Sequence, residues 1–346
     1  MQWIANKGID LPTVDSLLEE PLRTNQFTNG GKNVQRLEKY IHSEFGIDDS
    51  KVVIAVANGS LAIHALACGV DYTTGRELQW ATQAFTFPSS AQSNLRGVKI
   101  IDIDENGGLD LAQVDESIQG IIVTNIFGNV VDIDKYEAYC AEHNKYLIFD
   151  NAATAHTFYK GKNSLNYGVG ATISFHHTKP FGFGEGGAII VDKKYEKAIR
   201  CLNNFGIGLT DRYWVSEGNN NKMSEIAAIY ILQYLKHSKD TIVEKHGELM
   251  NRFVKEMARR DITHFKMFPS FHDTCMVPSC FSLLFDEYDE SFLERLLAKG
   301  INARKYYHPL DESRVANETF DRILCLPCNI DMTNKDIETI FDVLSL

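Results

Sequence analysis

TISFHHTKPFGFGEGGAIIV, residues 172–191, contains both the sheet pattern that decides the fold and the chain's sharpest chemical signal. Two β-branched runs, TISF at 172–175 and AIIV at 188–191, have the composition of buried strands. Between them lie one lysine, Lys179, and four glycines within six residues around Glu185. A lysine that leaves a strand into glycine-rich backbone is partly desolvated, which lowers its pKa and lets the amine form a Schiff base. A lone lysine is ordinarily a solvated surface side chain, and this context favours the reactive role.

Five further apolar runs precede this pair of strands. They alternate with stretches of helical periodicity, one around Val34, Leu37, Ile41 and Phe45 and another at 133–140. Such alternation is typical of parallel strands joined by crossover helices. We therefore predict one large sheet of seven strands, whose other members are VVIAV at 52–56, LQWAT at 78–82, VKIIDI at 98–103, GIIVTN at 120–125 and YLIFD at 146–150.

The pattern changes after about residue 236. One long amphipathic helix is followed by a region with a single clear strand, FSLLF at 281–285, and by a closing helix from Asn334. We predict a large domain over residues 1–236 and a smaller α+β domain over 237–346. No Pro- or Ser-rich linker separates them, so the two domains are expected to share an interface.

Composition excludes several classes of function. A net charge of -11 argues against a general affinity for nucleic acid, because phosphate contacts need clustered Lys and Arg. No apolar run approaches the roughly 20 residues that span a bilayer, and the start MQWIANKGIDL lacks the layout of an export signal, so we expect a cytoplasmic protein that does not enter the membrane. The seven cysteines are scattered and expected to be reduced, and the Cys325/Cys328 pair has no second pair with which to bind a metal.

Polar residues follow two of the predicted strands, where an open parallel sheet binds its ligands. Asn58, Gly59 and Ser60 open a helix whose free N–H groups suit a phosphate, although a helix cap by Asn58 or Ser60 explains them equally well. Asp150 ends the strand YLIFD. A carboxylate there needs hydrogen bonds or a cation such as a protonated pyridine nitrogen, and capping of the next segment is the even alternative.

These segments together resemble the DegT/DnrJ/EryC1/StrS family of sugar aminotransferases. The resemblance implies an α/β fold of the aspartate aminotransferase type (fold type I), with a mixed, mostly parallel seven-stranded sheet and a smaller α+β C-terminal domain. It also implies pyridoxal 5'-phosphate (PLP) as cofactor and a homodimer with shared active sites. The matching segments are TNGGKNVQRLEKYI at 28–41, NGSLAIHAL at 58–66, FDNAATAH at 149–156, SFHHTK at 174–179, GEGG at 184–187, GNNNKMSE at 218–225, YYHPL at 306–310 and ILCLPCNIDMTNKDIETIFDVL at 323–344.

The resemblance assigns roles around the cofactor ring. Lys179 would bind PLP covalently and then move a proton between the substrate carbon and the cofactor. Asp150 would pair with the pyridinium nitrogen, and Phe87 in AFTFPSS would lie against the ring, with core packing as the alternative for Phe87. Many relatives have Gln or His three residues after the aspartate. This chain has Ala153 there, so the contact with the ring oxygen is not assigned.

The resemblance also assigns the phosphate contacts. They would come from the backbone of Gly59 and Ser60, from the hydroxyl of Ser174 and, across the dimer, from Asn220 of the neighbouring subunit. Asn219 and Asn221, in the same run of three, are alternatives for that last contact. Four cations are candidates for the phosphates of a substrate: Arg23, Lys32, Arg304 and Lys305.

The implied reaction uses L-glutamate and a keto-sugar nucleotide. Glutamate would give its amino group to the cofactor. A 4-keto-6-deoxy sugar on dTDP would then be converted to a 4-amino-4,6-dideoxy sugar. The segments LNYG at 165–168 and SFHHTK at 174–179 are most similar to that branch of the family or to 3-amino sugar enzymes. Other possibilities are a 3-keto sugar aminotransferase, a regulatory protein that binds PLP or a sugar nucleotide without turnover, and an α/β protein whose glycine-rich loop is only structural. Deoxygenating dehydratases of this fold have histidine at the position of Lys179.

Overall fold

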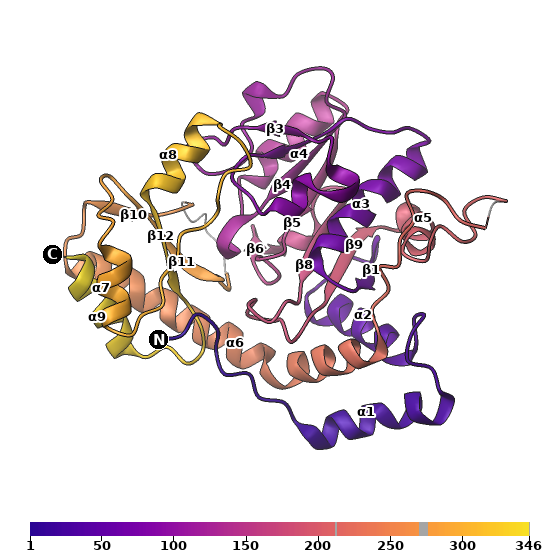
Figure 1. Cartoon of the computed structure of the whole chain (residues 1–346), viewed down its shortest axis with the longest axis horizontal. Coiled ribbons are helices and arrows are strands. Elements are labelled where there is room, and N and C mark those ends of the chain that lie inside the picture. The colour runs from indigo at the N-terminus through magenta and orange to yellow at the C-terminus, as the bar shows by residue number, and fades with distance from the viewer. Residues whose placement is uncertain (212, 270–275, 346) are drawn as a thin grey trace.

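A seven-stranded sheet forms the centre of the computed structural model, which describes residues 1–211, 213–269 and 276–345 (Figure 1). All seven predicted runs are its strands, and the α/β class with a mixed, mostly parallel sheet is confirmed. Only β9 runs against its neighbours β1 and β8. The order across the sheet is β1 (Lys51–Val56), β9 (Gly187–Asp192), β8 (Gly170–Ser174), β5 (Tyr146–Asp150), β4 (Gly120–Thr124), β2 (Trp80–Gln83) and β3 (Lys99–Ile101).

Helices cover both faces of this sheet. Side chains alternate along a strand, so Val53 and Ala55 of β1 join the core under α2, whereas Ile54 and Val56 join the core under α3. Burial on both faces explains why the strands read as continuous apolar runs. The helices and the hairpin of this part are α1 (Leu11–Thr24), α2 (Lys32–Glu44), α3 (Gly59–Thr74), α4 (Ile133–Glu142), α5 (Glu196–Leu202), β6 (Phe158–Tyr159) and β7 (Lys162–Asn163).

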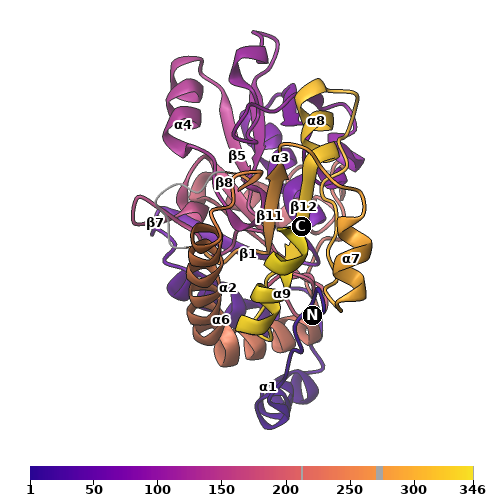
Figure 2. The same cartoon turned by 90° about the vertical axis from the view of Figure 1, so that its left-hand side faces the viewer.

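A second core gathers the C-terminal elements. Phe253, Phe281, Leu283 and Phe341 pack there, apart from the residues of the large sheet. Figure 2 shows β11 and β12 at the centre of this part with α7 and α9 beside them. Its elements are β10 (Phe265–Met267), β11 (Cys280–Phe285), β12 (Ile323–Pro327), α7 (Phe292–Ala298), α8 (Arg314–Arg322) and α9 (Asn334–Leu344).

The 35-residue helix α6 (Glu225–Arg259) connects the two cores. Ile231 and Leu235 pack in the core of the large sheet, and Leu249 and Phe253 pack in the C-terminal core (Figure 1). The predicted boundary between residues 236 and 237 therefore falls inside a continuous helix, and the division into two domains stays a prediction. Within the described ranges, no helix has both the length and the apolar character needed to cross a bilayer.

Candidate active site

The carboxyl ends of β1, β5 and β8 lie at one edge of the sheet, and a candidate site residue lies at or just beyond each of them. Asp150 ends β5, Ser174 ends β8, and Gly59 opens α3 just beyond β1. A Cβ added at Gly59 would lie 2.9 Å from the Cβ of Ser174, so the start of α3 touches the end of β8. The fold thus brings together three segments that are far apart in sequence.

Asp150 is buried, with an exposed fraction of 3%. One carboxylate oxygen, Oδ1, accepts hydrogen bonds from the Ala152 N–H at 3.1 Å and from the Thr172 hydroxyl at 3.0 Å. Among the described residues, none donates to the other oxygen. Burial raises the pKa of Asp150, and these two hydrogen bonds and the nearby Lys179 and His64 oppose the rise. These hydrogen bonds, which include the predicted cap, therefore occupy Oδ1, and the second carboxylate oxygen remains available to a cationic partner.

Lys179 lies in the turn that follows β8. Burial lowers the pKa of its amine, and the negative charge of Asp150 is the largest effect opposing that shift. The side-chain nitrogen has no hydrogen-bond partner among the described residues. A desolvated amine of lowered pKa is neutral more often than a surface lysine, and the neutral amine is the nucleophile. The site therefore holds a reactive amine close to a buried carboxylate.

The start of α3 offers unpaired donors beside a hydroxyl. The side chain of Asn58 accepts from the Leu61 N–H at 2.9 Å, so the predicted cap is present. That cap leaves the N–H groups of Gly59 and Ser60 in the first turn, where a helix supplies no acceptor. The hydroxyl oxygen of Ser174 accepts from the His176 N–H at 3.2 Å and keeps its own hydrogen to donate. Capping and anion binding are thus compatible here.

These features fit PLP. The phosphate matches the donors of Gly59, Ser60 and Ser174, the ring nitrogen matches the open oxygen of Asp150, and the aldehyde matches the amine of Lys179. A group of His, Cys, Asp or Glu side chains arranged for a metal ion is absent from the described parts of the chain.

Ser174→Ala tests the phosphate end of this arrangement. A hydrogen bond to a charged group contributes about 1.5–3 kcal/mol, so the variant should bind PLP at least about tenfold more weakly. Titration of the cofactor-free protein with PLP measures the effect. Ser43→Ala, which removes an exposed hydroxyl bonded only to the Tyr40 carbonyl, is the matched control. Equal affinities in the two variants would remove Ser174 from the phosphate site.

Phe87 follows β2 at the same edge of the sheet and is 55% exposed. A residue packed in the core would be shielded from solvent, so core packing does not account for Phe87 in a single chain. An exposed aromatic face beyond a strand end can lie against a flat ring.

The three consecutive asparagines differ in their surroundings. Asn221 is buried, and its side chain donates to the Asn203 side chain at 3.0 Å. The Asn219 side chain accepts from the Asn220 N–H at 2.8 Å. The side chain of Asn220 is exposed and has no partner among the described residues. Asn221 is therefore occupied within its own chain, whereas the side-chain NH2 groups of the exposed Asn219 and Asn220 both remain available to a neighbouring subunit.

Of the four candidate cations, two have contacts within the chain and two have none among the described residues. The guanidinium of Arg304 donates to the Tyr306 hydroxyl at 2.9 Å and lies 4.8 Å from the ring centre of Trp3. Lys305 donates to the Asp321 carbonyl at 2.9 Å. Arg23 and Lys32 are exposed and have no partner among the described residues, which leaves them as the freer candidates for substrate phosphates.

Two further residues lie near the site. Thr172, which donates to Asp150, could have been found, because residues 172 and 174 of one strand point to the same face. Lys7 donates to the backbone of the turn that carries Lys179, and no local pattern in the sequence marks it.

Comparison with known proteins gives consistent results. The profile of the DegT/DnrJ/EryC1/StrS aminotransferase family matches residues 12–345. The UDP-4-amino-4,6-dideoxy-N-acetyl-beta-L-altrosamine transaminase of Campylobacter jejuni is 26% identical, over 99% of this chain and 96% of its own. The dTDP-4-amino-4,6-dideoxy-D-glucose transaminase of Shigella dysenteriae is 27% identical, over 94% and 93%. The crystal structure of DesI in the presence of its TDP-sugar product superposes with a TM-score of 0.84 at 23% identity, over 99% of this chain and 93% of that one.

Proposed function

The chain belongs to the DegT/DnrJ/EryC1/StrS aminotransferase family and is a PLP-dependent sugar aminotransferase, and from this premise we propose that it aminates a 4-keto-6-deoxy sugar carried by a nucleotide. L-glutamate is the proposed amino donor, dTDP the proposed nucleotide and a 4-amino-4,6-dideoxy sugar the proposed product. The observation that carries the proposal is the half-buried Lys179, whose amine has a pKa lowered by desolvation and lies near Asp150 at the carboxyl edge of the sheet.

The proposed roles follow from the surroundings of each residue. When bound, PLP supplies an aldehyde that takes up the amino group and an electron-poor ring that stabilises negative charge on the substrate carbon. Lys179, whose pKa is lowered by burial, would accept the proton from that carbon and later return one. Asp150 would offer its open oxygen to the ring nitrogen, and Gly59, Ser60 and Ser174 would bind the phosphate. Phe87 would lie against the ring.

The nucleotide is the least constrained part of this proposal. The two relatives named above act on UDP- and dTDP-linked sugars and are almost equally similar to this chain. The segments LNYG and SFHHTK favour dTDP, and the site gives no direct contact with a base. The test therefore compares dTDP-, UDP- and GDP-linked 4-keto-6-deoxy sugars and one 3-keto sugar nucleotide, with L-glutamate as donor.

The product of each reaction can be identified by mass spectrometry and NMR, which distinguish amination at carbon three from carbon four. Preferred formation of a dTDP-4-amino sugar supports the full proposal. If the 3-keto substrate is aminated faster, the position of the reaction is wrong. If glutamate produces no change at all, the regulatory alternative replaces the enzyme.

The homodimer with shared sites is part of the proposal and can be tested by mixing subunits. Lys179→Ala removes the reactive amine, whereas Asn220→Ala removes one phosphate contact and weakens PLP binding, so both variants should be slow at limiting PLP. In a mixed dimer with shared sites, one active site carries both changes and the other carries none. Co-expression of the two variants, assayed at limiting PLP, should therefore give more activity than either variant shows alone. If each site is built from one chain, the mixed dimer should show only the average of the two variants' activities. Location in the cytoplasm stays a prediction from the sequence.

A further inference from the structure

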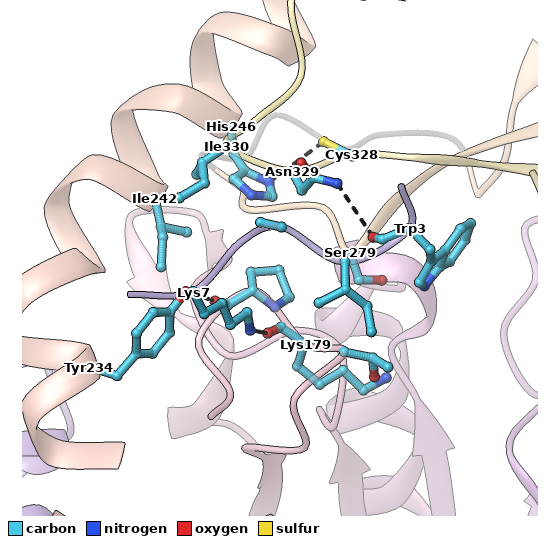
Figure 3. A pocket seen from close by; sticks show the side chains of 14 residues that line it. Trp3, Lys7, Lys179, Tyr234, Ile242, His246, Ser279, Cys328, Asn329 and Ile330 are labelled. Atoms are coloured by element: carbon cyan, nitrogen blue, oxygen red, sulfur yellow. Dashed lines mark hydrogen bonds between the residues drawn. The ribbon is translucent and has the colours of Figure 1, made fainter. Parts of the chain in front are cut away.

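Lys7 is a partly buried cation whose hydrogen bonds go only to backbone carbonyls. Its ammonium donates to the carbonyl oxygen of Lys179 at 2.6 Å (Figure 3). The same ammonium donates to the carbonyl oxygen of Gly182 at 2.5 Å. It also lies 5.1 Å from the ring centre of Tyr234. Among the described residues, no carboxylate forms an ion pair with it, and burial lowers its pKa to about 7. Buried charges in proteins are usually paired with an opposite charge, and Lys7 departs from that pattern.

The contacts of Lys7 close the turn that carries the reactive lysine. Within the turn, the Gly182 N–H donates to the Lys179 carbonyl at 3.0 Å. The Tyr234 hydroxyl donates to the carbonyl of Pro180 at 3.1 Å. Lys7 and Tyr234 together therefore hold the carbonyls of residues 179, 180 and 182 from outside. The turn also packs tightly, because a Cβ at Gly182 would lie 2.0 Å from the His176 carbonyl oxygen.

The segment that carries Lys7 is anchored at the C-terminal part of the chain. The Asn6 N–H donates to the Asp331 carboxylate at 2.7 Å. The Asn329 side chain donates to the Gln2 carbonyl at 3.0 Å. It also donates to the Trp3 carbonyl at 3.4 Å (Figure 3). Residues 2–7 thus connect the loop after β12 to the turn after β8.

We propose that Lys7 is a positioning residue for amino transfer, which fixes the turn Lys179–Gly182 by binding both of its ends and so holds the Lys179 amine in place at the site. This inference rests on the proposed role of Lys179. A displacement of about 1 Å of a reacting group can lower a rate by about 10²-fold. Loss of the two contacts should therefore affect turnover more than folding.

Lys7→Met tests the proposal with readouts that do not all depend on turnover. In the cofactor-free protein, hydrogen exchange of the peptide covering 176–184 should become about tenfold faster, because the bonds of the Lys179 and Gly182 amides lose their external support. With cofactor and glutamate, kcat should fall at least about tenfold while the KM for glutamate changes little. Lys7→Arg, whose guanidinium can donate to both carbonyls, should recover much of both losses.

Lys51→Met is the matched control. Lys51 is also a buried lysine bonded to a carbonyl, that of Gly168 at 2.9 Å, but it pairs with Asp192 at 2.8 Å and lies at the opposite edge of the sheet. Its loss should lower the unfolding temperature and leave kcat unchanged. Lys7→Met should lower kcat and leave the unfolding temperature nearly unchanged, because it leaves no acid without a partner, whereas Lys51→Met leaves Asp192 unpaired.

Two results would overturn the inference. One is wild-type exchange and wild-type kcat in Lys7→Met. The other is a loss of kcat that follows a loss of stability in both lysine variants alike. If the wild type itself shows no response to glutamate, the proposed function fails and the inference falls with it, whatever the exchange data show.

Discussion

Lys179→Ala is expected to lower kcat for the reaction with glutamate by at least about 10³-fold, because one side chain supplies both the covalent attachment and the proton transfer. The loss of acid–base catalysis alone is commonly about 10²–10⁴-fold. Stopped-flow absorbance and product assays with saturating PLP measure the change. The fold should survive, since the substitution removes a buried amine whose pKa is lowered by desolvation rather than a partner in an ion pair.

Lys197→Ala is the control for this variant. Lys197 lies on α5, is exposed and has no partner among the described residues. Its replacement should leave kcat and the unfolding temperature unchanged. A Lys179→Ala protein that turns over at more than about a tenth of the wild-type rate would show that another group moves the proton.

Asp150→Asn is expected to lower kcat by about 10²–10³-fold, the usual effect of removing one group that stabilises charge in a transition state. Asparagine keeps an oxygen that can accept from Ala152 and Thr172, so the local hydrogen bonds remain. What is lost is the negative charge that would pair with the ring nitrogen. The measurement is kcat with saturating PLP and glutamate.

The same variant should not lose stability. Burial raises the pKa of Asp150, so near its raised pKa the folded chain binds more protons than the unfolded chain, in which the group has its ordinary pKa of 3.8. As pH rises from 3.8 through the raised pKa, Asp150 therefore contributes less and less to the free energy of unfolding. Above the raised pKa, the full cost of the buried charge lowers stability. Cofactor-free Asp150→Asn should unfold at the wild-type temperature or above it near neutral pH, and the difference should vanish as pH falls.

Asp192→Asn is the matched control for Asp150. Asp192 accepts from Lys51 at 2.8 Å, at the edge of the sheet away from the site. Its variant should show the opposite pattern, with lower stability and unchanged kcat. If Asp150→Asn instead unfolds earlier than the wild type and retains its turnover, Asp150 serves structure and has no role at the cofactor.

The large sheet could be predicted from sequence because most of its strands are short apolar runs, many of them β-branched, that are buried on both faces. The C-terminal sheet was harder. Strand β11 was predicted, but β10 has only three residues, and β12, ILCLP, was recognised only as part of a matching segment. The first turns of α6 were also missed, because EIAAIYILQYL is buried on most of its surface and gives little helical contrast between faces.

The site could be predicted in part for a similar reason. Parallel strands end at one edge, so Asp150, Ser174 and the start of α3 had to meet once the strands were identified. Lys7 could not be predicted, because it lies 172 residues from Lys179 and contacts its backbone. The proposed role of Asn220 depends on a second chain, which no single-chain pattern describes.

The most direct test of the account is the visible absorbance spectrum of the purified protein supplied with PLP, recorded before and after L-glutamate, beside that of Lys179→Ala. The account predicts a yellow band in the wild type that is lost on addition of glutamate and that the variant does not form. A wild-type protein that stays colourless with PLP and does not respond to glutamate would contradict the role of Lys179 and the mechanism that depends on it.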